Sequence, residues 1–160
     1  MKYLYENSYN RKINEMENLN RFYINGRWVT PISNHSMPVI NPATEKQIGT
    51  VAIGDAADVN RAVSAAKNAF ETYSVSSKAE RVNLLKKVKT FTKKRFEELA
   101  QAMRMEMGAP ITMSREAQAD AAIGHLVGFI DALEKIEERV NLSNGDILVR
   151  EPIGVCGLIT

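Results

Sequence analysis

The chain has 160 residues, of which 44% are hydrophobic and 25% charged, and its formal net charge is +2 at pH 7. This length suffices for one hydrophobic core, and the composition is ordinary for a globular protein. So small a charge gives no reason to expect a nucleic-acid partner, and the absence of a long apolar stretch argues against a membrane-spanning helix. A single cysteine, Cys156, excludes an internal disulfide and favours a cytoplasmic location.

The first segment, residues 1–20, is polar and has neither helical nor strand periodicity, so we expect a disordered extension. Order is predicted to begin near Phe22, where Asn25-Gly26 separates two β-prone runs. Both residues tolerate the positive φ of a type I′ turn, which predicts a tight hairpin. A second strand pair is predicted at residues 38–40 and 47–52, joined by the turn chemistry of Asn41-Pro42-Ala43-Thr44.

After Gly54 the hydrophobic period changes from two to 3.6, which predicts helices. Asp55 is expected to cap the first, and Ser77 and Glu80 form a capping box for the second. A third helix should end at Gly108, and a fourth should run from near residue 114 to residue 138. Its small residues would let a neighbouring backbone approach closely; they are Ala117, Ala121, Gly124 and Gly128.

The last part of the sequence reads as β structure. Gly145 is predicted to turn the chain into a strand at residues 147–150, and the apolar run Ile153 to Ile159 reads as a buried strand. The fold class is therefore α/β, with hairpins and helices preceding the first strand of an incomplete sheet. Because an open α/β sheet binds its ligand beyond the carboxyl ends of its strands, we expect the chemistry to lie downstream of residue 160.

Candidate chemistry within the chain is sparse. His125, among apolar neighbours, is expected to be a packed core or boundary residue and not a metal ligand, and His35 to be exposed in a polar loop. Cys156 is expected to be buried as a small hydrophobe, because no base or helix N-terminus is near it in sequence. No catalytic residue and no metal ligand is assigned. One basic run is interpreted as a solvated helix face: Lys86, Lys87, Lys89, Lys93, Lys94 and Arg95.

Several separate motifs occur in one characteristic order: Tyr23-Ile24-Asn25-Gly26-Arg27-Trp28, Val39-Ile40-Asn41-Pro42-Ala43-Thr44, Asp58-Val59-Asn60-Arg61-Ala62-Val63, Glu106-Met107-Gly108-Ala109-Pro110 and Glu151-Pro152-Ile153-Gly154-Val155-Cys156-Gly157. In content, order and spacing they resemble the opening of an NAD(P)-dependent aldehyde dehydrogenase. The resemblance covers about residues 22–160.

The resemblance implies a Rossmann-like cofactor-binding domain and a domain plan. Residues 1–20 would be the polar extension, 21–140 the hairpins and helices of the cofactor-binding domain, 141–151 an oligomerisation-type strand, and 152–160 the first strand of the cofactor-binding sheet. It also implies a homo-oligomer. Ile159 and Thr160 match family positions that line the cofactor pocket, so they are the cofactor-binding candidates.

The family mechanism uses a cysteine thiolate to attack an aldehyde, a nicotinamide to accept hydride, and a base to hydrolyse the thioester. The family's cysteine and glutamate base have no counterpart in the chain, and Cys156 aligns with a strand residue. The leading interpretation is therefore that the chain is an N-terminal fragment of such an enzyme. By itself the 160-residue chain is expected to be inactive and to bind neither NAD nor NADP. The alternative is a non-catalytic helical and hairpin scaffold or interaction module. Neither the aldehyde nor the choice between NAD and NADP can be read from the sequence.

Overall fold

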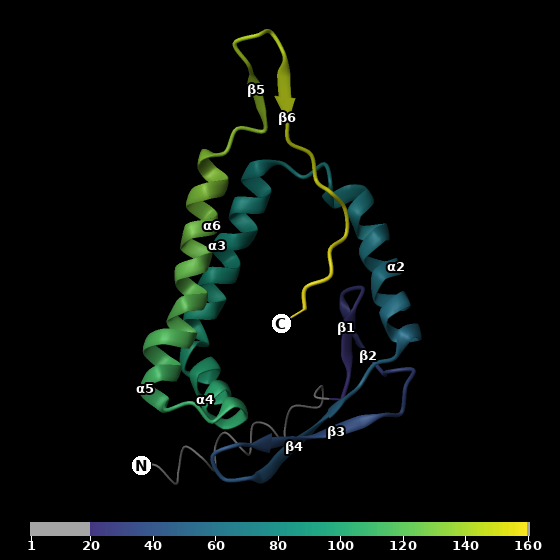
Figure 1. Cartoon of the computed structure of the whole chain (residues 1–160). Helices are drawn as coiled ribbons and strands as arrows, with labels where there is room; N and C mark the ends of the chain where they lie inside the picture. Colours follow the sequence, from purple (N-terminus) through teal and green to yellow (C-terminus); the bar gives the residue numbers. More distant parts are fainter. Residues whose placement is uncertain (1–19, 160) are drawn as a thin grey trace.

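The computed structural model describes residues 20–159, so Thr160 and all but the last residue of the expected polar extension lie outside the described residues. Figure 1 shows helices joined to three separate antiparallel hairpins. In chain order the elements are β1 (Phe22–Ile24), β2 (Arg27–Val29), β3 (Ser36–Asn41), β4 (Lys46–Ala52), α2 (Ala56–Tyr73), α3 (Lys78–Lys94), α4 (Phe96–Met107), α5 (Ile111–Met113), the π-helix η1 (Ser114–Ala119), α6 (Asp120–Lys135), β5 (Arg139–Asn141) and β6 (Ile147–Val149).

Both predicted N-terminal hairpins are confirmed. In the β1–β2 turn Asn25 has φ 53° and Gly26 has φ 74°, the positive values that a type I′ turn requires. In the β3–β4 turn the side-chain oxygen of Asn41 accepts a hydrogen bond from the Ala43 N–H at 2.9 Å, and its backbone carbonyl accepts from Glu45 at 2.8 Å. The asparagine therefore closes an Asx turn, as its position before a proline predicts.

The predicted helix starts are also confirmed. The Asp55 carboxylate accepts hydrogen bonds from the N–H groups of Ala57 and Asp58 at the start of α2. Ser77 and Glu80 form the reciprocal capping box that begins α3. Gly108 ends α4 with φ +69°, the left-handed conformation that favours glycine at this position.

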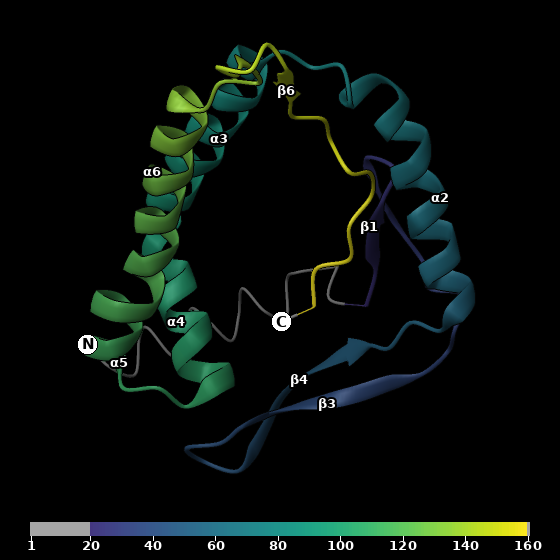
Figure 2. The same cartoon turned by 45° about the horizontal axis from the view of Figure 1, so that its top comes forward.

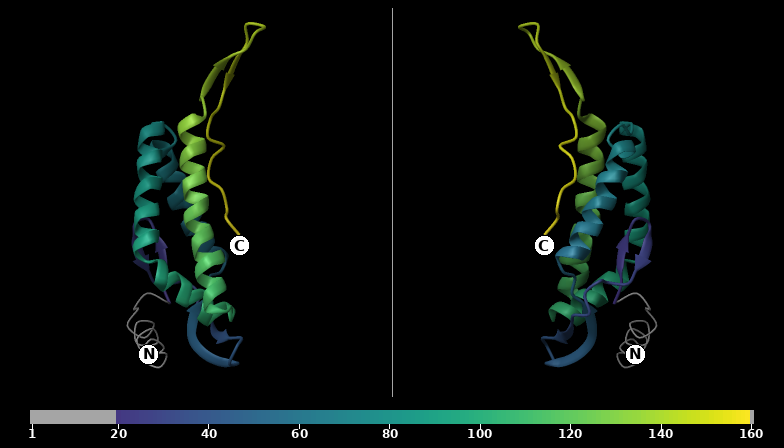
Figure 3. Two further views of the ribbon diagram at one scale, coloured as in Figure 1. Left: turned by 90° about the vertical axis from the view of Figure 1, so that its left-hand side faces the viewer. Right: turned by 90° about the vertical axis from the view of Figure 1, so that its right-hand side faces the viewer.

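The elements form an open frame. Figures 1 and 2 show α3 and α6 side by side in one wall, α2 in the opposite wall, and the β3–β4 hairpin along the base. Figure 3 shows the β5–β6 hairpin extending beyond the ends of the helices. The frame therefore has helical walls and no central sheet in the described part of the chain.

The buried core is small. Within residues 20–159 the buried hydrophobic side chains are Ile24, Val29, Val82, Ala100, Met105, Ala119 and Ile130. The accessible surface is 12300 Å², whereas a compact protein of 17.9 kDa exposes about 8,000 Å². The helices have the predicted apolar periodicity, yet Val59 is 59% exposed, Phe91 63% and Phe129 67%. These faces lack a packing partner in the described residues.

The strand expected from Ile153 to Ile159 does not form in this structure. Residues 150–159 have no assigned strand, and Ile153 and Leu158 are each 94% exposed. A strand needs a neighbour for its N–H and C=O groups, and no described element supplies one. Strand pairing at 152–160 therefore stays a prediction for a chain that offers a neighbouring strand.

The fourth predicted helix differs from the observed structure in three ways. It is divided into α5, η1 and α6, because residues 114–119 adopt π-helical geometry. It ends at Lys135, and residues 139–141 instead form β5, which pairs with the predicted strand β6. No neighbouring backbone approaches two of its small residues in this structure, since a Cβ at Gly124 or Gly128 would meet nothing within 4 Å, so the close approach stays a prediction for a chain that offers a neighbouring element.

Gly108→Ala should destabilise the protein, because alanine resists a φ of +69° and its Cβ would lie 2.7 Å from Cγ of Pro42. The left-handed conformation alone costs about 1–2 kcal/mol. Gly124→Ala is the matched control, since it adds a methyl group in open space and should stabilise α6 by about 0.5–1 kcal/mol. Urea unfolding followed by circular dichroism measures both changes. Equal effects of the two substitutions would contradict the described contact between Gly108 and the β3–β4 turn.

Candidate functional site

Cys156 is exposed, so the expectation that it is buried is wrong. The physical reason is that its segment does not form the expected buried strand. Its Sγ atom lies 3.9 Å from the carbonyl oxygen of Gly154, which is an acceptor and cannot serve as a base that activates a thiol. The geometry therefore does not make a nucleophile of Cys156.

The predicted exposure is confirmed for one histidine and wrong for the other. His35 is exposed in the loop before β3, as predicted, whereas His125 is exposed on α6 and is not the packed residue that its apolar neighbours suggested. The face of α6 that carries His125 has no covering element among the described residues. Within residues 20–159 no group of three or more His, Cys, Asp or Glu side chains is placed to hold a metal ion.

The cofactor candidates lie at the end of the chain. Figure 1 shows this C-terminal segment descending from β6 between α2 and the α3–α6 wall, and Figure 3 shows it at an edge of the molecule. Ile159 is 98% exposed, so it lines no enclosed pocket in this structure. Thr160 lies outside the described residues. A cofactor contact by either residue stays a prediction.

Asp58 joins the N-terminal hairpins to α2. Its carboxylate accepts hydrogen bonds from the N–H groups of Ile32 at 2.9 Å, Ser33 at 3.3 Å and Asp55 at 3.4 Å, and the residue is only 3% exposed. The bond from Ile32 is the main cause that lowers the pKa of Asp58, and loss of hydration opposes it. Asp58 thus fixes the β2–β3 loop at the start of the helix.

Sequence reasoning missed this role of Asp58. The available signal was the Asp-x-x-Asp spacing of Asp55 and Asp58, in which the second acid can complete a capping box. No local signal, however, indicates that the same carboxylate also binds a loop 25 residues away.

A second junction holds the β3–β4 turn against α4. The side-chain nitrogen of Asn41 lies 3.9 Å from the sulfur of Met105, and both residues are buried. Pro42 packs beside Gly108 at the end of the same helix. These contacts bring together two of the motifs that were recognised separately in the sequence.

The third junction is an ion pair between α4 and the π-helix. The Arg115 guanidinium donates to both carboxylate oxygens of Glu97, at 2.9 Å and 2.7 Å, and Gln101 donates to the same carboxylate at 2.8 Å. The bonds from Arg115 lower the pKa of Glu97 below its usual range, against the opposing effect of burial. This bidentate geometry fixes the start of η1 on α4.

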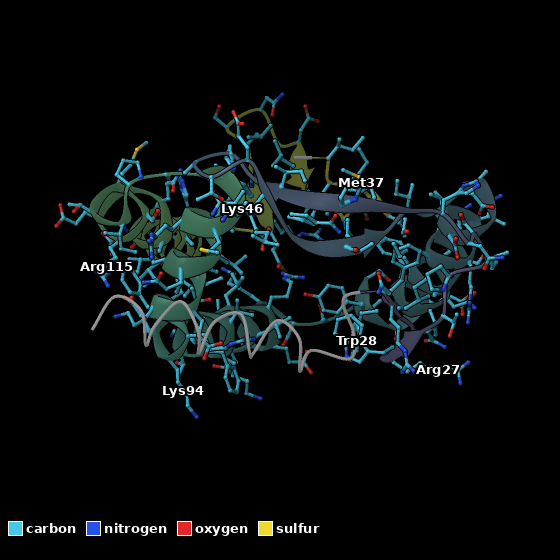
Figure 4. All side chains as sticks on the ribbon, turned by 90° about the horizontal axis from the view of Figure 1, so that it is seen from below. Arg27, Trp28, Met37, Lys46, Lys94 and Arg115 are labelled. Carbon is cyan, nitrogen blue, oxygen red and sulfur yellow. The ribbon has the colours of Figure 1, made fainter. Side chains whose placement is uncertain are left out.

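The predicted basic face on α3 is partly structural. Lys86 of this run forms an ion pair with Glu134 of α6 at 2.7 Å, and Arg81, which precedes the run on α3, pairs with Glu138 beyond the end of α6. Seen from below, Lys94 points away from the frame (Figure 4). The run therefore contributes to the α3–α6 wall as well as to the solvated surface. None of the helices in residues 20–159 has the length and apolarity to cross a membrane.

Comparisons with known proteins agree on one family. The sequence model of the aldehyde dehydrogenase family matches residues 28–160. A Staphylococcus aureus protein named as an aldehyde dehydrogenase is 42% identical over 147 residues, covering 91% of this chain and 30% of the relative. A 3-succinoylsemialdehyde-pyridine dehydrogenase from a Pseudomonas species is 40% identical over 146 residues, with the same two coverages.

Solved structures show the same relationship. The crystal structure of an aldehyde dehydrogenase C variant from Pseudomonas syringae, complexed with NAD+ and octanal, is 39% identical and superposes with a TM-score of 0.83 over 86% of this chain and 28% of that chain. An aldehyde dehydrogenase from Bartonella henselae gives 36% identity and a TM-score of 0.80, covering 84% and 29%. The chain belongs to the aldehyde dehydrogenase family. It spans about 30% of the length of the curated relatives that it matches.

Glu97→Gln should reduce the stability of the α4–η1 junction near neutral pH and make it less sensitive to acid. Because the native pKa of Glu97 is lowered, its ion pair stabilises the fold above the unfolded pKa of 4.5. That stabilisation is lost as pH falls through the lowered native pKa. Thermal unfolding measured between about pH 7 and pH 3 should therefore show a smaller acid-induced decrease in the variant. Glu116→Gln removes an exposed carboxylate of η1 as the control, and a decrease identical to that of Glu97→Gln would contradict this role.

Proposed function

We propose that the chain is the N-terminal part of an NAD(P)-dependent aldehyde dehydrogenase that oxidises an aldehyde to a carboxylic acid. The observation that carries the proposal is the coverage, because relatives match over 91% of this chain but over 30% of their own length. The catalytic cysteine and glutamate of the family belong to the part of those relatives that lies beyond this match. The isolated 160-residue chain is then inactive, and it supplies scaffold to the enzyme.

In that enzyme residues 21–140 are the hairpins and helices of the cofactor-binding domain. Residues 152–160 pair with further strands of the cofactor-binding sheet, which would bury Ile153 and Leu158. When bound, the nicotinamide of NAD or NADP accepts hydride from the substrate. Ile159 and Thr160 would contact this cofactor at the carboxyl end of their strand. The NAD+ named with the Pseudomonas syringae structure supports this assignment.

The segment 141–151 is assigned to assembly. Its strand β6 forms a hairpin with β5 that projects from the helices (Figure 3). Ile147 and Val149 of this strand are exposed. An exposed strand edge with apolar side chains suits pairing with another subunit of a homo-oligomer. The single cysteine supports a cytoplasmic location, the family supports a small-molecule aldehyde as substrate, and the small net charge gives no reason to expect a nucleic-acid partner.

The exposed helix faces favour this proposal over an independent scaffold module. A module that folds by itself would cover large apolar side chains such as Phe91 and Phe129, since large exposed patches mark interaction or aggregation surfaces. In an aldehyde dehydrogenase, the part of the protein beyond the 30% that this chain spans would pack against these side chains. A hydrophobic dye should therefore bind the isolated chain.

The 160-residue chain should show no aldehyde-dependent reduction of NAD or NADP, and joining it to the rest of an aldehyde dehydrogenase should restore the reaction. The suitable partner is the Staphylococcus aureus relative, with its matching 147 residues replaced by this sequence. Absorbance of the reduced nicotinamide measures turnover with a panel of aldehydes.

Two controls complete the test. Replacing the catalytic cysteine in the Staphylococcus aureus part of the chimera should abolish turnover, whereas Cys156→Ala in this part should leave it. A folded chimera that binds no cofactor and has no activity would contradict the proposal. Turnover by the isolated chain that disappears in Cys156→Ala would also contradict it.

A further inference from the structure

A pocket of about 190 Å³ lies between the β1–β2 hairpin and α2, and no residue of the C-terminal segment that carries the cofactor candidates lines it. The hairpin contributes apolar and polar lining residues, and α2 contributes one face. On that face Arg61, Ala65 and Asn68 follow at helical spacing, and the small side chain of Ala65 leaves room between the two polar ones.

The pocket has an apolar floor and a cationic rim. Ile24 and Val29 are buried members of the hairpin, whereas Arg27 and Arg61 are exposed and line the same pocket from the hairpin and from α2. Asn25 and Asn68 add amides, and no acidic residue lines the pocket. Guanidinium groups and amides are the donors that bind carboxylate and phosphate oxygens.

Both arginines keep donors available. The Arg27 side chain forms no hydrogen bond or ion pair with another residue in the described range 20–159. Arg61 donates to the Thr30 carbonyl oxygen at 3.5 Å. Asp58 is near enough to interact with Arg61 electrostatically, but its carboxylate is occupied by the N–H groups of Ile32, Ser33 and Asp55. Asp58 therefore does not occupy the guanidinium donors of Arg61.

We infer that this pocket binds a small organic oxyanion, with its carboxylate or phosphate group between Arg27 and Arg61 and its short apolar part against Ile24 and Val29. The volume limits the ligand, since typical pockets for drug-sized molecules have about 300–1,000 Å³. A complete dinucleotide is therefore too large. The inference is independent of the proposed dehydrogenase activity, because no lining residue is among the cofactor candidates.

Titration of the 160-residue chain with butyrate, inorganic phosphate and neutral butyramide tests the site. Chemical shifts of the backbone amides in the hairpin and α2 follow binding. We expect saturable shifts with at least one of the two anions and none with butyramide. Stronger binding of butyrate would identify a carboxylate ligand, and stronger binding of phosphate would identify a phosphate ligand. Equal shifts with butyrate and butyramide, or no saturable shifts with either anion, would overturn the inference.

Arg27→Gln is the decisive variant, because within the part of the chain that the structure describes the substitution breaks no side-chain hydrogen bond or ion pair. It should weaken anion binding about tenfold or more, as expected when a charge-assisted hydrogen bond is removed. Arg61→Lys keeps the charge but loses the planar fork, and it should weaken binding less than Arg27→Gln. Lys67→Gln removes an equal charge from α2 outside the pocket and should leave the affinity unchanged. A loss in Lys67→Gln equal to that in Arg27→Gln would show general charge attraction and overturn the site.

Discussion

The helices of this chain carry more apolar surface than its other described elements can cover. α3 and α6 bury Val82 and Ile130, but outward-facing apolar side chains such as Phe91 and Phe129 remain in solvent. A protein of this size normally derives its stability from one continuous core. The open frame follows from this shortage of buried apolar surface. Because no described sheet packs against these helix faces, α2 stands apart from α3 and α6 (Figure 2).

Polar junctions hold the frame where core packing does not. Asp58 fixes the β2–β3 loop on α2, Asn41 organises the turn that meets α4, and Glu97 binds the start of η1 through Arg115. Each junction satisfies backbone or charged groups that would be costly to leave unpaired. The arrangement of hairpins and helices therefore resembles that of the family's solved structures, with a TM-score of 0.83, although the core is small.

The same arrangement separates two kinds of surface. The apolar helix faces and the segment ending at Ile159 are exposed, and Figure 1 shows that segment descending between α2 and the α3–α6 wall. The pocket with Arg27 and Arg61 lies between the β1–β2 hairpin and α2, and its lining residues all belong to the described part of this chain. In the proposed enzyme the first surface is covered by further polypeptide, whereas the second can be tested directly on this chain.

The sequence by itself determined the local features: the Asn25-Gly26 turn, the caps at Asp55 and Ser77, and the helix end at Gly108. These depend on interactions within a few residues, so their chemistry is visible in the order of the amino acids. It also determined the family, through motifs spread along the chain. Only the tertiary structure decided that His125 and Cys156 are exposed, that β5 pairs with β6, and that Asp58 binds a distant loop. The exposure of a side chain and the pairing of a strand depend on which elements lie next to them. Apolar periodicity predicts which face of a helix is apolar, but it does not show whether another element packs against that face.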